Sequence, residues 1–271
     1  MAPSPIRIAV LEADVPINYT RAKYGSYGAV FTSLLHKAAD ASNIARERLE
    51  ITGWDVINSE SAQDGKVDEM GGEWNWKRRK GYPKMEDVDA VLITGSRYNA
   101  FDNDPWVVRL VGFVKEVLAQ SRVRVIGVCY GHQIVGRALG AKVARSEGGA
   151  WEVSVSQVNL TEKGKELFGK GALNIHQMHK DLVYYYPEGV EELGSSGPCK
   201  VQGMYVPKRL VTVQGHPEFT EEIVADLLEN RHKLNIFPDG IYEDGMARVG
   251  NPQDGVLVAQ AFLKFVMEDC G

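Results

Sequence analysis

Short apolar segments rich in β-branched residues alternate with amphipathic segments along the first half of this chain, and this alternation constrains the fold most. Residues 6–11 (IRIAVL) predict a buried strand, and apolar positions three and four apart over residues 27–41 predict a helix after it. Further strands are predicted at residues 49–57, 90–93 and 123–128, and a further helix at residues 107–119. Because parallel strands need helical crossovers, we expect an α/β protein with a mostly parallel sheet covered on both faces.

The second half of the chain has a different pattern. Residues 151–213 contain short alternating stretches that are typical of antiparallel strands, so we expect a small antiparallel extension of the sheet. Two helices are predicted near residues 220–234 and 255–267, in a C-terminal helical extension over residues 220–271. Because we find no internal repeat and no clear linker, a single domain of residues 1–271 is predicted.

A polar segment separates two of the predicted strands. Residues 59–84 are rich in glycine and charge, and they predict a surface insertion in the α/β pattern. Long loops of this kind sometimes close over a site as a lid, but many are loops without further function. The sequence leaves both interpretations open.

Composition excludes several classes of protein. The net charge is −5 and the basic residues are scattered, so the continuous positive face of a nucleic-acid binder is not expected. Three cysteines are an odd number and too few for a disulfide framework, which favours a reducing compartment. The first residues lack the features of a signal peptide, and no apolar stretch approaches the length of a membrane span. We therefore expect a cytoplasmic protein with no membrane partner.

A cysteine stands at a strand-to-helix turn. In residues 127–133 (GVCYGHQ), Cys129 follows an apolar strand and precedes a helix predicted to begin near Gly131. Such a turn holds a nucleophile out into a cleft, and the positive end of the helix favours a thiolate. A buried and inert thiol fits the same position equally well. The turn alone leaves both interpretations open.

A histidine and a glutamate follow the strand predicted at residues 209–213. His216 and Glu218 stand two positions apart in the sequence QGHPE, so on an extended segment they project to the same side. A nucleophilic cysteine needs an imidazole to exchange protons with it, and the imidazole needs an acid to fix its tautomer. The pair therefore favours Cys129 as a nucleophile.

These two segments resemble those of a known family. Residues 129–133 (CYGHQ) and 215–218 (GHPE) look like the nucleophile and His/Glu motifs of class I, or triad, glutamine amidotransferases. The resemblance is closest to GMP-synthase-type glutaminase domains and to their stand-alone relatives, which include plant γ-glutamyl peptidases. It covers about residues 6–224. It implies a flavodoxin-like three-layer α/β/α sandwich, a γ-glutamyl thioester on Cys129, His216 as the base and Glu218 as the orienting acid.

The resemblance also implies an oxyanion hole made by backbone N–H groups. One donor comes from a turn after a strand, where this chain has Gly95 and Ser96, and the other is the residue after the nucleophile, Tyr130. Family members usually have glycine where Ser96 stands. Because a backbone donor needs no particular side chain, we still expect Ser96 and Tyr130 to supply the two N–H groups.

Further residues are implied to bind the substrate. Gln133 matches the glutamine of the nucleophile motif, which helps to hold the glutamyl end. Residues 176–181 (HQMHKD) resemble the Ser-His-Gly-Asp stretch of GMP-synthase-type domains, which places Met178 and His179 at the substrate carboxylate. Trp151 follows a glycine-rich segment where the family lines its glutamine pocket, although it also suits an apolar core. A specificity rim after two of the strands would consist of Asp14, Arg97, Tyr98 and Phe101.

The implied reaction is acyl transfer, which needs no metal or organic cofactor. His176 and His179 lack further ligands at a spacing that suits a metal, and no phosphate-binding loop of the form GxxxxGK[ST] is present. About fifty residues follow the region of resemblance, which is too few for an ATP-dependent synthetase domain.

Three functions fit these observations. We favour a stand-alone enzyme that hydrolyses or transfers small γ-glutamyl substrates related to glutamine or glutathione. The second is a glutaminase subunit that supplies ammonia to a separate synthetase partner. The third is a binding or regulatory protein that kept the fold without activity. The presence of all three residues of the triad, Cys129, His216 and Glu218, argues against it. The sequence does not predict an oligomeric state.

Overall fold

The computed structural model describes residues 4–58, 67–70 and 76–268. The strands are β1 (Ile6–Glu12), β2 (Leu49–Asp55), β3 (Val67–Glu69), β4 (Lys77–Lys80), β5 (Ala90–Ile93), β6 (Arg124–Val128), β7 (Val143–Arg145), β8 (Glu152–Leu160), β9 (Ala172–His179), β10 (Asp181–Val183), β11 (Glu191–Ser195), β12 (Gly203–Val206) and β13 (Leu210–Val213). The helices are α1 (Asn18–Tyr24), α2 (Tyr27–Ala41), α3 (Pro105–Ala119), α4 (Tyr130–Ala138), α5 (Glu162–Phe168), α6 (Glu221–Lys233), α7 (Asp239–Arg248) and α8 (Gly255–Met267). Among these helices, none combines the length and the apolar composition that a membrane crossing requires.

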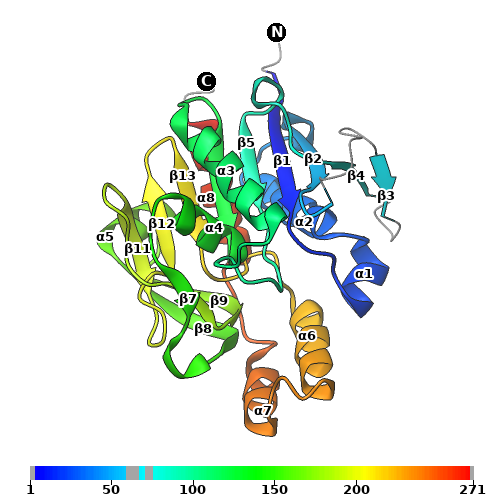
Figure 1. Cartoon of the computed structure of the whole chain (residues 1–271), viewed down its shortest axis with the longest axis vertical. Helices are drawn as coiled ribbons and strands as arrows, with labels where there is room; N and C mark the ends of the chain where they lie inside the picture. Colours follow the sequence, from blue (N-terminus) through cyan, green and yellow to red (C-terminus); the bar gives the residue numbers. More distant parts are fainter. Residues whose placement is uncertain (1–3, 59–66, 71–75, 269–271) are drawn as a thin grey trace.

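A large sheet lies between two layers of helices, with α3 and α4 on one face and α2 and α8 on the other (Figure 1). Its strand order is β3-β4-β2-β1-β5-β6-β13-β12-β11-β8-β9, and every pairing from β4 to β13 is parallel. Alternate residues of β1 point to opposite faces, as a strand requires. Ile8 and Val10 pack with α2 and α8, whereas Ala9 and Leu11 pack with α3 and α4. The predicted flavodoxin-like α/β/α sandwich is confirmed.

The antiparallel extension is larger than the small one expected. β12, β11, β8 and β9 follow β13 in the sheet, and each of these neighbours pairs antiparallel with the next. The alternating stretches predicted within residues 151–213 include β8 and β13. β11 and β12 were not anticipated, since short strands such as Gly203–Val206 carry too few residues for a periodic signal.

The C-terminal region contains both predicted helices and one more. α6 and α8 agree with the predicted ranges within two residues. α7 lies between them, and its few apolar residues, Ile241, Tyr242 and Met246, are only partly buried, which leaves a weak helical pattern in the sequence. α8 packs against α2 within the sandwich, whereas α6 and α7 lie beyond the carboxyl edge of the parallel strands (Figure 1).

Part of the segment predicted as a surface insertion belongs to the sheet. β4 pairs with β2 in parallel and β3 pairs antiparallel with β4, so the prediction of a loop is wrong for these residues. A buried ion pair of 2.9 Å between Arg78 and Asp55 joins β4 to the end of β2. Trp76 also donates a hydrogen bond from Nε1 to the buried Glu12, at 2.9 Å. The lid hypothesis falls mainly on residues 59–66 and 71–75, which lie outside the described residues.

Candidate active site

The carboxyl ends of four neighbouring parallel strands lie around one cleft. Asp14 follows β1, Gly95 follows β5, Cys129 follows β6, and His216 follows β13, with β1, β5, β6 and β13 adjacent in that order. Sites in open α/β sheets gather at this edge because the loops there converge. The cleft has two adjoining parts. We call the part lined by Cys129 the cysteine pocket, and the part lined by His216 and Glu218 the histidine pocket.

The turn at Cys129 is sharp and strained. Cys129 has φ 52°, a value uncommon for residues other than glycine, and it directly precedes α4, which begins one residue before the predicted start. Such a conformation costs on the order of 1–3 kcal/mol. The turn is held by a hydrogen bond of 2.9 Å from the Cys129 N–H to the Val213 carbonyl. It also requires Gly131, because a Cβ there would lie 2.3 Å from the Ile93 carbonyl oxygen.

The His216 ring is fixed on several sides. Nδ1 of His216 lies 2.8 Å from Oε1 of Glu218, and both side chains are buried. The ring stacks on Phe219 with the centroids 4.0 Å apart and the planes at 2°. The His216 N–H donates to the His176 carbonyl at 2.7 Å. Because Glu218 occupies Nδ1, Nε2 is the nitrogen left to interact with the Cys129 side chain.

The charge state of His216 follows from these neighbours. Burial alone would lower the pKa of the imidazole, but the negative charges of Cys129 and Glu218 and hydrogen bonds to both raise it to about 10. The imidazole therefore keeps its proton at neutral pH, beside the Cys129 sulfur. A nearby imidazolium is an environment that favours a thiolate. His132 behaves in the opposite way, since burial lowers its pKa to about 3 and leaves it neutral.

This raised pKa predicts the alkaline side of the pH profile. His216 must be protonated to give a proton to a leaving amine, and a raised pKa extends that protonated state upward in pH. We expect kcat/KM for a γ-glutamyl substrate to stay level from about pH 7 to about pH 9 and to fall above about pH 10. Initial rates across this range would test it. A fall of kcat/KM as the pH rises through about 6.5, the pKa of an ordinary imidazole, would contradict the raised pKa of His216.

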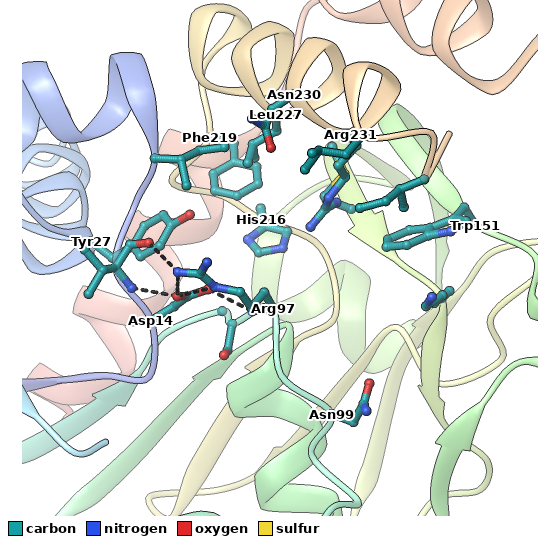
Figure 2. A pocket seen from close by; sticks show the side chains of 18 of the residues that line it. Asp14, Tyr27, Arg97, Asn99, Trp151, His216, Phe219, Leu227, Asn230 and Arg231 are labelled. Carbon is teal, nitrogen blue, oxygen red and sulfur yellow. Dashed lines mark hydrogen bonds and ion pairs between the residues drawn. The ribbon is translucent and has the colours of Figure 1, made fainter. Parts of the chain in front are cut away.

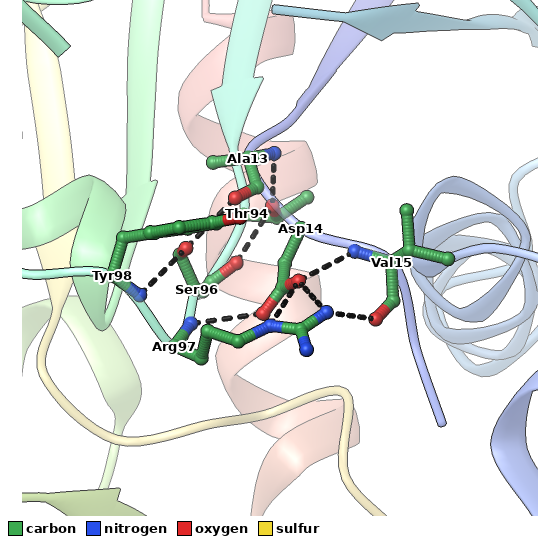
Figure 3. Close-up of polar contacts among 8 residues, drawn as sticks. Ala13, Asp14, Val15, Thr94, Ser96, Arg97 and Tyr98 are labelled. Carbon is green, nitrogen blue, oxygen red and sulfur yellow. Dashed lines mark hydrogen bonds and ion pairs between the residues drawn. The ribbon is translucent and has the colours of Figure 1, made fainter. Parts of the chain in front are cut away.

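The predicted oxyanion-hole residues lie beside the cleft. Ser96 lines both pockets, and its hydroxyl donates to the Ala13 carbonyl at 2.7 Å and accepts from the Tyr98 N–H at 3.2 Å (Figure 3). These bonds hold the Ser96 side chain against the end of β1. The Tyr130 N–H belongs to the first turn of α4, whose amides lack partners within the helix. That these two N–H groups form an oxyanion hole remains a prediction.

Gly95 leaves room for the imidazole, because a Cβ there would lie 2.6 Å from Cε1 of His216. We expect Gly95→Ala to displace the ring from Cys129 and to lower kcat by about 100-fold, since displacements of about 1 Å have such effects. Rates and melting temperatures of the variant would check this. Gly112→Ala is the matched control, because nothing lies within 4 Å of that added Cβ. Wild-type kcat in Gly95→Ala would show that the ring position does not limit the reaction.

The residues implied to bind substrate all line the cysteine pocket. Gln133 is buried, and its Nε2 donates hydrogen bonds to the Asp181 carbonyl at 2.8 Å and to Oε1 of Gln214 at 3.1 Å. This nitrogen is therefore already bound within the protein. Nε2 of His179 lies 3.2 Å from the buried Glu152. Met178 and Trp151 line both pockets. Their contacts with a substrate remain predictions.

Three of the four rim residues border the cleft. Asp14 and Arg97 line the histidine pocket and form an ion pair of 2.6 Å, and Arg97 also donates its backbone N–H to Asp14 (Figure 3). Tyr98 lines the cysteine pocket. Phe101 instead packs against the apolar cluster on the α3 and α4 face.

Several residues of the cleft were not anticipated, and Phe219 and Arg231 are two of them. Phe219 follows the GHPE segment directly, and an aromatic beside a histidine gives no signal without the fold. Arg231 lies in α6 and lines both pockets. Among the described residues, no group of three or more His, Cys, Asp or Glu could hold a metal ion.

Known proteins identify the family. The family model described as Glutamine amidotransferase class-I matches residues 73–233. A glutamine amidotransferase-like protein of Schizosaccharomyces pombe is 35% identical over 265 residues, which cover 96% of this chain and 98% of that protein. Gamma-glutamyl peptidase 2 of Arabidopsis thaliana is 26% identical over 88% of this chain and 86% of its own. The crystal structure of a glutamine amidotransferase from Thermotoga maritima matches with a TM-score of 0.65 at 16% identity, covering 96% of this chain and 98% of that one.

The chain therefore belongs to the class-I glutamine amidotransferase family, as the two sequence motifs suggested. This membership and the more distant γ-glutamyl peptidase relatives support an enzyme of the amidohydrolase type.

Proposed function

We propose that this protein hydrolyses γ-glutamyl amide bonds through a γ-glutamyl thioester on Cys129. The observation that carries the proposal is the buried His216–Glu218 pair together with the interaction of His216 with the cysteine at the strand-to-helix turn. This arrangement supplies a nucleophile, a proton carrier and an orienting acid in one cleft. Among the described residues, Cys199 is the other cysteine, and it is buried away from both pockets.

The first half-reaction is acylation. The Cys129 thiolate attacks the carbonyl carbon of the γ-glutamyl amide, and the N–H groups of Ser96 and Tyr130 stabilise the negative oxygen that forms. His216 then gives its proton to the leaving nitrogen as the carbon–nitrogen bond breaks. Glu218 keeps the imidazole in the required orientation and stabilises its positive charge.

The second half-reaction is hydrolysis of the thioester. His216, now neutral, takes a proton from a water molecule that attacks the same carbonyl carbon. The carbon–sulfur bond breaks, glutamate is released, and the Cys129 thiolate and protonated His216 are restored. His216 thus gives a proton in the first half-reaction and takes one in the second, which requires a fixed imidazole.

The leaving group distinguishes the candidate activities. A stand-alone hydrolase or peptidase is favoured by relatives named gamma-glutamyl peptidase, one of which covers 95% of this chain at 25% identity. A glutaminase subunit would instead pass ammonia from glutamine to a separate synthetase. Comparison of ammonia release from glutamine with amine release from γ-glutamyl dipeptides, by purified protein, separates the two. Glutaminase activity that arises only after a synthetase is added would contradict the stand-alone activity.

A further inference from the structure

Two cations flank Trp151 where the two pockets meet. The Lys180 ammonium lies 4.9 Å from the centroid of the indole ring, and the Arg231 guanidinium carbon lies 5.0 Å from it. Figure 2 shows the Arg231 side chain reaching from α6 into the space between His216 and Trp151. Trp151, Lys180 and Arg231 line both pockets. We call these three residues the cationic wall.

Arg231 contacts the rings of Trp151 and Phe237 but, unlike Arg97 and Arg145 of the same cleft, has no acidic partner among the described residues. Its Nη1 is buried and has no hydrogen-bond partner, and no carboxylate of the described residues forms an ion pair with it. By contrast, Arg97 is paired with Asp14 at 2.6 Å, and Arg145 with Asp181 at 3.2 Å. A buried guanidinium donor without an acceptor is costly, and because this one lines both pockets, a ligand in the cleft can supply the missing acceptor.

The positive charge of the wall is only partly compensated. Burial lowers the pKa of Lys180, and Arg145 and Arg231 lower it further against the opposing effect of Asp181. Burial likewise lowers the pKa of Arg231. An anion beside Trp151 would stabilise the positive charge of both side chains. The planar guanidinium in particular suits a carboxylate, which can accept two parallel hydrogen bonds from it.

The position of Arg231 indicates which part of a substrate meets it. In the proposed reaction the leaving nitrogen faces His216. The histidine pocket, which His216 lines and Cys129 does not, is therefore the place for the leaving group. Its remaining walls include the apolar side chains of Phe219, Leu227 and Ile236, so an apolar group fits beside the cation.

We propose that Arg231 binds a carboxylate on the leaving group, so that the preferred substrates are γ-glutamyl amino acids or peptides with a free carboxyl end. This inference rests on the proposed function. Lys180, which contacts the same Trp151 ring, adds positive charge for the same anion. The leaving amine of such a substrate lies near His216 while its carboxylate accepts from the Arg231 guanidinium. Glutamine, whose leaving group is ammonia, cannot make this contact.

The test compares two substrates that differ in one group. γ-Glutamyl-leucine ends in a carboxylate, and γ-glutamyl-leucinamide ends in a neutral amide. We expect the wild-type enzyme to have a higher kcat/KM for γ-glutamyl-leucine than for the amide. In Arg231→Gln, kcat/KM should fall roughly 10- to 100-fold for γ-glutamyl-leucine but less than about threefold for the amide. Arg231→Lys should recover part of the loss. Lys233→Gln is the matched control, because that side chain is 73% exposed on the same helix.

The outcomes separate the two proposals. An equal loss on both substrates would overturn the assignment to the leaving group, because the glutamyl end is common to both. Equal wild-type rates on the two substrates would overturn it as well, and this measurement needs no variant to fold. If wild-type enzyme hydrolysed neither compound nor glutamine, the proposed function would fail and this inference with it.

Discussion

Replacing Cys129 with alanine is expected to abolish turnover of γ-glutamyl substrates, with a fall in kcat of about 10⁴-fold or more. Without the sulfur no thioester can form, and the imidazole and oxyanion donors that remain can only assist direct attack by water. Amine release by purified variant and wild type measures the effect. The fold should survive, because alanine keeps the Cβ that cysteine already has at this backbone and loses only one small buried atom.

Cys199→Ala is the control for this variant. Cys199 is also a free, buried cysteine, but burial raises the pKa of its thiol to about 12 and keeps it protonated. Loss of Cys199 should cost some stability while kcat stays within about twofold of wild type. Activity near the wild-type level in Cys129→Ala would mean that the nucleophile is a different residue.

Glu218→Gln is expected to lower kcat by about 10²- to 10⁴-fold, the range found when the orienting acid of a triad is neutralised. The variant keeps the shape of the side chain but removes the negative charge beside Nδ1 of His216. Because that charge raises the pKa of His216, its removal should also move the alkaline fall of kcat/KM to lower pH. A pH series on the variant measures both changes.

The matched control replaces a carboxylate outside the cleft. Glu222 lies in the exposed first turn of α6 and lines neither pocket. Glu222→Gln should change stability by less than about 1 kcal/mol and leave the pH profile unaltered. If Glu218→Gln kept both its kcat and its alkaline limit, Glu218 would have no part in holding the charged imidazole.

The fold of the parallel half followed from the sequence because its signals are local. Buried parallel strands such as β1 are continuous apolar runs, and α2 and α3 bury one face each, so periodicity shows them. β4 could not be recognised in this way. Its sequence KRRK is that of a solvated surface, and only the contact with Asp55 explains why Arg78 is buried. Neither segment of such a distant pair shows the pairing in its own sequence pattern.

The same distinction applies to the site. Cys129, His216 and Glu218 stand in short motifs at strand ends, so the sequence predicted that they would meet. The space that Gly95 leaves for the His216 ring depends on the packing of β5 beside β6 and β13, which no motif records. Arg231 was missed for a similar reason. It lies in a helix rich in charged residues, and its neighbour Trp151 is distant in the chain.

Trapping of the acyl-enzyme tests the central claim most directly. Wild-type protein would be mixed with a γ-glutamyl substrate, quenched in acid during turnover, digested and examined by mass spectrometry. The proposal predicts a γ-glutamyl group on the peptide that contains Cys129, and its absence from Cys129→Ala. Continued turnover with the acyl group on another residue, or with no acyl group on any peptide under conditions that preserve thioesters, would contradict it.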